Sequence, residues 1–211
     1  MSQYPIPARE TRVELTVVNS RFIATAAPVF SVDEAKEFVA RIKDEFADAS
    51  HNVSVYLIGH GASVTAHCTD DGEPAGTAGR PALAVLQGSG LGDVAVVVTR
   101  YFGGTKLGTG GLVRAYGDAV REVLAVLPRA QRVPTYTVLL EVPYHTYERL
   151  CLLIEAHGGE IQDQDFGAGV TLQARLPEDR YPAFESALQE ASNGRLEALV
   201  VDQGEAIVPI T

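Results

Sequence analysis

The 211-residue sequence predicts an α+β fold that is divided into two domains, residues 1–130 and 134–211. Strand patterns of period 2 alternate with helix patterns of period 3.6 along the chain, as expected where sheets pack against helices. The segment PRAQRVP, residues 128–134, has proline at both ends and no apolar pattern, which indicates a linker. The charge also changes there: residues 1–133 hold 13 Lys and Arg against 14 Asp and Glu, and the remainder holds 4 against 13.

The first part of the N-terminal domain predicts a sheet with one helix against it. Apolar and polar residues alternate in the first strand segment, and Ser31 and Glu34 form a capping box ahead of a helical periodicity. Turns at Asn19-Ser20 and at the glycines near residue 60 separate neighbouring strands. The predicted elements are strands at 11–17, 20–26, 53–59 and 62–68 and a helix at 32–47.

The second part of this domain places two unusual loops around a buried strand. The segment DVAVVVT, residues 93–99, is apolar throughout and predicts a central strand that is covered on both faces. Pro81 suits the first turn of one helix, and Pro128 ends a longer amphipathic helix. The predicted elements are an acidic loop at 69–80, a helix at 81–88, a glycine-rich loop at 103–111 and a helix at 112–127.

The C-terminal domain repeats strand, helix and strand patterns in the order βαββαβ. Glycine pairs and Asn-Gly steps indicate where its helices end. This order is the split βαβ arrangement of ferredoxin-like domains. The predicted elements are strands at 135–142, 160–165, 169–175 and 196–202 and helices at 144–157 and 178–192.

Composition narrows the classes of protein that the chain can represent. Apolar residues make up 46% and charged residues 21%, which is typical of soluble globular proteins. The sequence has no apolar run that is long enough to cross a bilayer and no signal-peptide pattern, so no membrane association is expected. Only two cysteines, Cys68 and Cys151, are present, which argues against a disulfide framework and predicts a cytoplasmic location.

The glycine-rich loop is the first candidate site. Such a loop can turn several backbone N–H groups toward one point, and the helix that follows adds partial positive charge there. The loop is not a Walker A motif, because Thr105 precedes Lys106 where that motif has glycine. The alternative is that the glycines only permit tight turns and close packing. The residues assigned to an anion or nucleic-acid site are Arg21, Arg100, Gly103, Gly104, Lys106, Gly108, Gly110, Gly111 and Arg114.

The acidic loop is the second candidate site. Its carboxylates, Asp70, Asp71 and Glu73, could bind a hard cation, act as an acid/base pair or dock to a basic surface. The alternative is a solvated turn, which the Asp-Gly and Glu-Pro pairs favour. His51 could join an acid/base pair or bind phosphate, although a structural role is commoner for such a histidine. We expect these four residues to line the surface of the glycine-rich loop, with no metal centre or cofactor assigned.

Three motifs of the N-terminal domain resemble the IMPACT/YigZ family. They are NSRF at 19–22, TDDGEPAGTAGRP at 69–81 and VVTRYFGGTKLGTGGLVRAYGDAV at 97–120. The resemblance covers about residues 1–130, and the second domain looks like the extra domain of bacterial YigZ-type members, which is similar to a domain of elongation factor G. It implies an N-terminal α/β sandwich with a left-handed βαβ crossover, as in ribosomal-protein and translation-factor domains.

The resemblance also implies a role in translation, because eukaryotic IMPACT proteins regulate translation through a protein partner. We therefore predict a non-enzymatic protein that binds RNA, the ribosome or a ribosome-associated protein through the glycine-rich loop. The alternative is a metal-assisted hydrolase of a phosphorylated or peptide-like small substrate that uses the acidic loop, with His51 as base. A third possibility is an adaptor whose acidic segments dock basic partner proteins.

Overall fold

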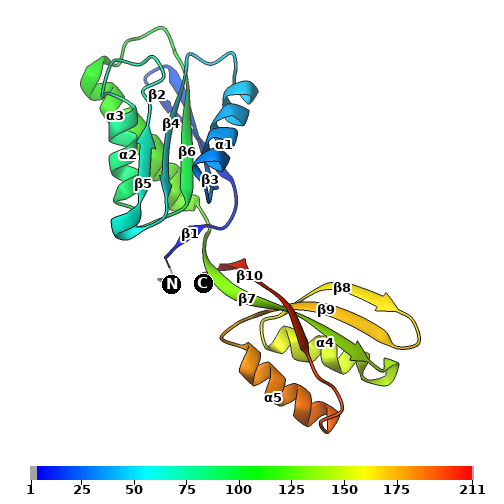
Figure 1. The fold of residues 1–211 in the computed structure, drawn as a ribbon. Coiled ribbons are helices and arrows are strands. Elements are labelled where there is room, and N and C mark those ends of the chain that lie inside the picture. Colours follow the sequence, from blue (N-terminus) through cyan, green and yellow to red (C-terminus); the bar gives the residue numbers. More distant parts are fainter. Residues whose placement is uncertain (1–3, 211) are drawn as a thin grey trace. The chain divides into compact units, whose positions relative to one another are not determined.

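The computed structural model describes residues 4–210, in which the chain forms two compact units (Figure 1). Unit 1 contains the residues up to Gln131 together with those from Val208 onward, and unit 2 contains Arg132–Ile207. Helices pack on a sheet and enclose a separate apolar core in each unit. The α+β class with two domains that the sequence predicts is therefore confirmed.

Unit 1 is built on a five-stranded sheet with the order β2–β3–β6–β4–β5 (Figure 1). Every neighbouring pair of strands in this sheet is antiparallel. The central strand β6 is buried along nearly its whole length, as its apolar sequence predicts. The strands are β2 Thr11–Val17, β3 Ser20–Pro28, β4 His51–Ile58, β5 Thr65–Cys68 and β6 Val94–Tyr101.

Helices cover both faces of this sheet. Ala35, Phe38 and Ile42 of α1 pack on one face, while α2 and α3 pack on the other and enclose the larger apolar cluster. The buried stripe of α3 follows the helical period of 3.6 residues, and the helix ends at Val126, two residues before Pro128. The helices are α1 Val32–Glu45, α2 Gly79–Gln87 and α3 Gly108–Val126, and a 3-10 turn, Gly61–Ser63, precedes β5.

Unit 2 has four strands in the order β10–β7–β9–β8, with α4 and α5 on one face (Figure 1). Both β7 and β8 pair antiparallel with β9. Side chains of α4 and α5, among them Ile154 and Phe184, meet the apolar face of the strands. The elements are β7 Arg129–Val142, α4 Tyr147–Ala156, β8 Glu160–Phe166, β9 Val170–Pro177, α5 Tyr181–Ser192 and β10 Leu199–Pro209, with a 3-10 turn at Tyr144–Thr146.

The boundary between the two units falls within the predicted linker at 128–134, but that segment is not irregular, because β7 begins at Arg129. The first residues of β7 pair with a two-residue strand, β1 Ile6–Pro7, which the sequence analysis did not predict. The amide of Ala8 also donates to the carbonyl of Pro128 at 2.8 Å. Because its partner strand is so short, this part of β7 needs no apolar alternation, and the pattern that would reveal a strand is missing.

The last strand also differs from its prediction at 196–202, because β10 runs over Leu199–Pro209. Nearly all of its side chains are exposed, and Asp202 to Glu205 interrupt its apolar pattern. Because the side chains are exposed and the apolar pattern is interrupted, the sequence does not indicate where the strand ends. Over residues 4–210, no helix has both the length and the apolar character that a membrane-spanning segment requires.

Candidate site at the N-terminus of helix α3

A pocket of about 310 Å³ lies where the acidic loop, the end of β6 and the start of α3 meet. Glu73 and Pro74 contribute from the acidic loop, and Arg100 and Phe102 contribute from the end of β6 and the residue after it. The remaining wall comes from residues 106–109 and Leu112. The structure therefore brings parts of both predicted loops to one pocket.

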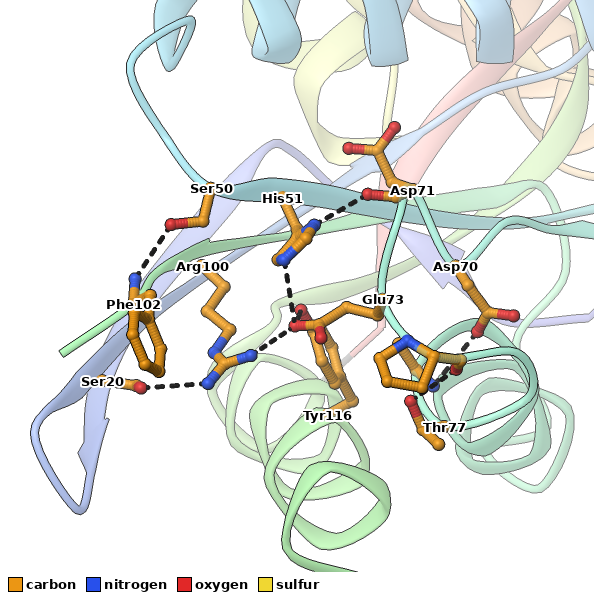
Figure 2. A network of polar contacts seen from close by, with 12 residues as sticks. Ser20, Ser50, His51, Asp70, Asp71, Glu73, Thr77, Arg100, Phe102 and Tyr116 are labelled. Atoms are coloured by element: carbon orange, nitrogen blue, oxygen red, sulfur yellow. Dashed lines mark hydrogen bonds and ion pairs between the residues drawn. The ribbon is translucent and has the colours of Figure 1, made fainter. Parts of the chain in front are cut away.

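A buried carboxylate forms the centre of this region (Figure 2). Glu73 Oε1 accepts from Arg100 Nη1 at 2.6 Å and from the hydroxyl of Tyr116 at 2.8 Å. Burial, together with the hydrogen bond to Glu73, raises the pKa of Tyr116 far above its ordinary value. Tyr116 is therefore a neutral hydroxyl donor at any physiological pH, and Arg100 supplies the positive charge that pairs with the Glu73 carboxylate at hydrogen-bond distance.

Arg100 lies in the interior, with only 4% of its surface exposed. Its Nη2 donates to Ser20 Oγ at 3.2 Å, and its guanidinium carbon lies 5.4 Å from the ring centre of Phe22 and 5.5 Å from that of Phe102. Within residues 4–210, Arg100 Nε is the one side-chain nitrogen or oxygen that is completely buried and has no hydrogen-bond partner. Such an atom is rare in folded proteins, and a ligand that accepts its hydrogen bond is one explanation for it.

His51 borders this network without joining it fully (Figure 2). Its Nδ1 lies 2.9 Å from the carbonyl oxygen of Asp71, so Nδ1 carries the proton and donates. Its Nε2 lies 3.8 Å from Glu73 Oε1, which is ion-pair range only when the imidazole is charged. The Asp71 carboxylate faces elsewhere, since it accepts from Lys43 Nζ at 2.5 Å and from the amide of Asn52 at 2.6 Å.

Asp70 has a structural role at the start of α2. Its carboxylate accepts from the amides of Gly76, Ala78 and Gly79 at 2.7, 3.1 and 2.8 Å, and it therefore caps a helix that has no capping side chain at Ala78. Burial alone would raise the pKa of Asp70, but the three amide donors outweigh it and hold that pKa below its usual value.

The capping role of Asp70 leads to a test of stability against pH. We expect Asp70→Asn to lower the free energy of unfolding by about 2 kcal/mol at pH 7, because hydrogen bonds to a charged acceptor contribute about 1.5–3 kcal/mol. The folded pKa is lowered, so this stabilisation is complete above the unfolded pKa and disappears as pH falls through the folded value. Urea denaturation at pH 7 and near pH 3 should show the difference between the two proteins shrinking in acid; a constant difference would contradict the assignment.

The glycines of the predicted anion site divide into two groups. Gly103 packs directly beneath the backbone of Asn19, and Gly104 and Gly108 have positive φ angles of 82° and 69° that favour glycine. Gly110 and Gly111 lie in the first turn of α3. The first group therefore shapes the loop, and the second leaves the backbone at the N-terminus of α3 without bulky side chains.

The basic residues of that site also have different surroundings. Lys106 is exposed, lines the pocket and has no ion-pair partner in the described part of the chain. Arg114 is exposed on α3, where its Nε donates to the carbonyl of Gly110 at 3.3 Å. Arg21 is paired with Glu14 at 3.0 Å, whereas Arg100 is neutralised by Glu73. Lys106 and Arg114 are therefore the basic groups best placed to meet a ligand.

Three residues of this region were not predicted from the sequence. Tyr116 lies on the buried face of α3, within the helix predicted at 112–127, but its hydroxyl reaches Glu73. Ser20 was placed in a turn, yet its hydroxyl oxygen accepts from Arg100 and from the amide of Gly103. Phe102 lies in the motif at 97–120 and had no predicted role. A tyrosine hydroxyl among apolar neighbours was the one signal available, since such a group needs a buried partner.

The three carboxylates of the acidic loop do not converge. Asp70 bonds to the start of α2, Asp71 to Lys43 and Asn52, and Glu73 to Arg100 and Tyr116. Among residues 4–210, no group of three or more His, Cys, Asp or Glu side chains is arranged to hold a metal ion. The geometry therefore gives no support to a metal-assisted hydrolase that uses these carboxylates.

Comparisons with known proteins agree with the motifs. The family model described as the Impact N-terminal domain matches residues 18–124, and a domain of unknown function (DUF1949) matches residues 140–195. The IMPACT family member YigZ of Escherichia coli strain K12 is 38% identical over 204 residues, which are 96% of this chain and 100% of that protein. Protein IMPACT of Bos taurus is 34% identical over 107 residues, which are 49% of this chain and 33% of that protein.

A solved structure supports the same relationship over the whole fold. A crystal structure described as that of a hypothetical protein is 37% identical, with a TM-score of 0.60, and the match covers 96% of this chain and 98% of that chain. Sequence and structure thus agree along nearly the full length. The resemblance seen in the three motifs is confirmed, and the chain belongs to the IMPACT family.

Proposed function

We propose that this protein is a translation-associated regulator that binds RNA, alone or on the ribosome, through the surface around the α3 N-terminus. One observation carries the proposal: Lys106 and the first turn of α3 line a pocket with no carboxylate paired to that lysine in the described residues. A helix N-terminus with a free lysine beside it favours phosphate oxygens. Arg114, one turn further along α3, extends the same positive surface.

Family membership and topology both support a role in translation. The connections β3–α1–β4 and β5–α2–β6 run in opposite directions across the sheet, with their helices on opposite faces. This arrangement supports the left-handed crossover that the resemblance implies for ribosomal-protein and translation-factor domains. The order β10–β7–β9–β8 likewise supports a ferredoxin-like, elongation-factor-G-like unit 2. A protein partner in translation control remains part of the proposal.

The proposal is tested by reversing charge at the two basic residues. We expect the double variant Lys106→Glu/Arg114→Glu to bind single-stranded RNA at least tenfold more weakly, with a flatter dependence of log K on log salt, because two phosphate contacts are lost. Fluorescence anisotropy at several salt concentrations measures both quantities. Co-sedimentation with ribosomes at low and moderate salt tests the same surface in its proposed setting.

A matched control separates this surface from a general effect of charge. Lys36 is exposed on α1, where it pairs with Asp33, and α1 covers the opposite face of the sheet. Lys36→Glu changes the net charge by the same amount as Lys106→Glu or Arg114→Glu alone, and it should leave RNA affinity unchanged. Equal losses in the control and in Lys106→Glu, or unchanged affinity in the double variant, would remove the proposed site.

A further inference from the structure

We propose that the pocket beside α3 takes one unstacked nucleobase of single-stranded RNA, and that it prefers a base with an amino group beside a ring-nitrogen acceptor, such as cytosine or adenine. This inference rests on the proposed function and adds base recognition to it. Lys106 and the first turn of α3 would hold a phosphate at the mouth of the pocket. The pocket itself would then read the base.

The size and lining of the pocket suit a planar aromatic ligand. Its volume of about 310 Å³ is at the lower end for small-molecule sites, and Pro74, Leu107 and Leu112 give it apolar walls. Phe102 lines it as well, although 47% of its surface is exposed. An exposed aromatic ring beside a phosphate-binding surface is the usual arrangement for stacking a base of single-stranded RNA.

Glu73 supplies a hydrogen-bond acceptor inside this pocket. Its side chain is only 3% exposed, and Oε1 accepts both hydrogen bonds, from Arg100 and Tyr116. Its other oxygen, Oε2, has no hydrogen-bond partner within residues 4–210. The amino group of a base would satisfy Oε2, whereas a carbonyl oxygen in the same place would be repelled by the carboxylate.

Arg100 supplies the matching donor. It lines the pocket, and its buried Nε–H has no acceptor in the described part of the chain. In cytosine and adenine a ring-nitrogen acceptor adjoins the amino group, so one base edge can serve both Glu73 and Arg100. Uracil presents the reverse pattern, with a carbonyl where cytosine has its amino group. A lysine or arginine of a protein ligand would instead meet the like charges of Arg100 and Lys106.

The experiment compares two pyrimidine oligonucleotides that differ only in this edge. Anisotropy titrations with ten-nucleotide oligocytidine and oligouridine should give about tenfold tighter binding of oligocytidine by the wild-type protein, as expected for a hydrogen bond to a charged acceptor. Phe102→Ala, at an exposed position, should weaken both oligonucleotides about tenfold because stacking is lost. Glu73→Gln, if circular dichroism shows that it is folded, should bring the ratio of the affinities for oligocytidine and oligouridine close to one.

The outcomes separate this inference from the proposed function. Equal affinity of the wild-type protein for the two oligonucleotides, with both weakened in the Lys106/Arg114 double variant, would overturn base recognition and leave phosphate binding intact. No salt-dependent binding of either oligonucleotide would overturn the proposed function. A preference for oligocytidine that survives in Phe102→Ala, at lower affinity for both, would support Glu73 and Arg100 as the groups that read the base.

Discussion

Replacing Arg100 with methionine is expected to destabilise unit 1 by about 3–5 kcal/mol, because removing one partner of a buried ion pair leaves the other charge without compensation. The Glu73 and Arg100 side chains are 3% and 5% exposed, and their pairing distance is 2.6 Å. Methionine keeps much of the side-chain volume beside Phe22, so the loss of stability comes from the uncompensated charge of Glu73 more than from a cavity. Amide hydrogen exchange along β6 measures the effect in unit 1 itself, since two units need not unfold together.

A double variant isolates the pairing of Glu73 with Arg100. Glu73→Gln alone should also be strongly destabilising, because Arg100 would remain buried and charged. Glu73→Gln/Arg100→Met removes both charges, so it should be more stable than the sum of the two single losses predicts, by about 1 kcal/mol or more. Additive losses would mean that the two side chains do not depend on each other, and the network in Figure 2 would lose its energetic basis.

The second large effect is expected at Gly103. A Cβ atom there would overlap the carbonyl oxygen and carbon of Asn19, which are backbone atoms that cannot rotate away. We expect Gly103→Ala to cost about 3 kcal/mol, at the upper end for overpacking, and to shift the turn before β3. Thermal unfolding followed by circular dichroism measures the loss. The substitution should also disturb the hydrogen bond from the Gly103 amide to Ser20 Oγ.

Gly110 is the matched control for Gly103. It lies seven positions further along, where a Cβ would meet no atom within 4 Å. Because Gly110 is within the first turn of α3, Gly110→Ala should stabilise the protein by about 0.5–1 kcal/mol through helix propensity. A loss of stability in both variants would show that the glycine-rich loop tolerates no change at all, and the close approach at Asn19 would not be the cause.

Local patterns explain why much of the fold was predictable. The capping box at Ser31 is confirmed, since Ser31 Oγ accepts from the amide of Glu34 at 3.1 Å and Glu34 Oε2 accepts from the amide of Phe30 at 2.9 Å. The apolar run of β6 likewise predicted a central strand. The pattern was weak in the exposed strand β10 and at the start of β7. Pairing between residues far apart in the sequence forms these strands, and no local sequence pattern predicts such pairing.

The candidate site was less predictable for the same reason. Sequence proximity indicated that Arg100 belongs with the glycine-rich loop, but the register of β6 against β3 places it beside Ser20 and Phe22. There it donates a hydrogen bond to Glu73. Likewise, neighbouring carboxylates in the acidic loop look like one cluster, yet each faces a different partner. Charge type can be read from sequence, whereas the partner of each charge depends on how strands are aligned.

The strand β7 gives unit 1 an unusual dependence on unit 2. Ile6 pairs with Ala130 at one edge, and the amide of Ile210 donates to the carbonyl of Arg129 at 3.0 Å. The hydrogen bond between Ile210 and Arg129 closes a loop that contains the whole of unit 2, and closing such a long loop is slow and entropically costly. Because residues 132–207 form a core of their own, that loop becomes short once unit 2 has folded. The pairing of Ile210 with Arg129 should therefore form faster when unit 2 is already folded.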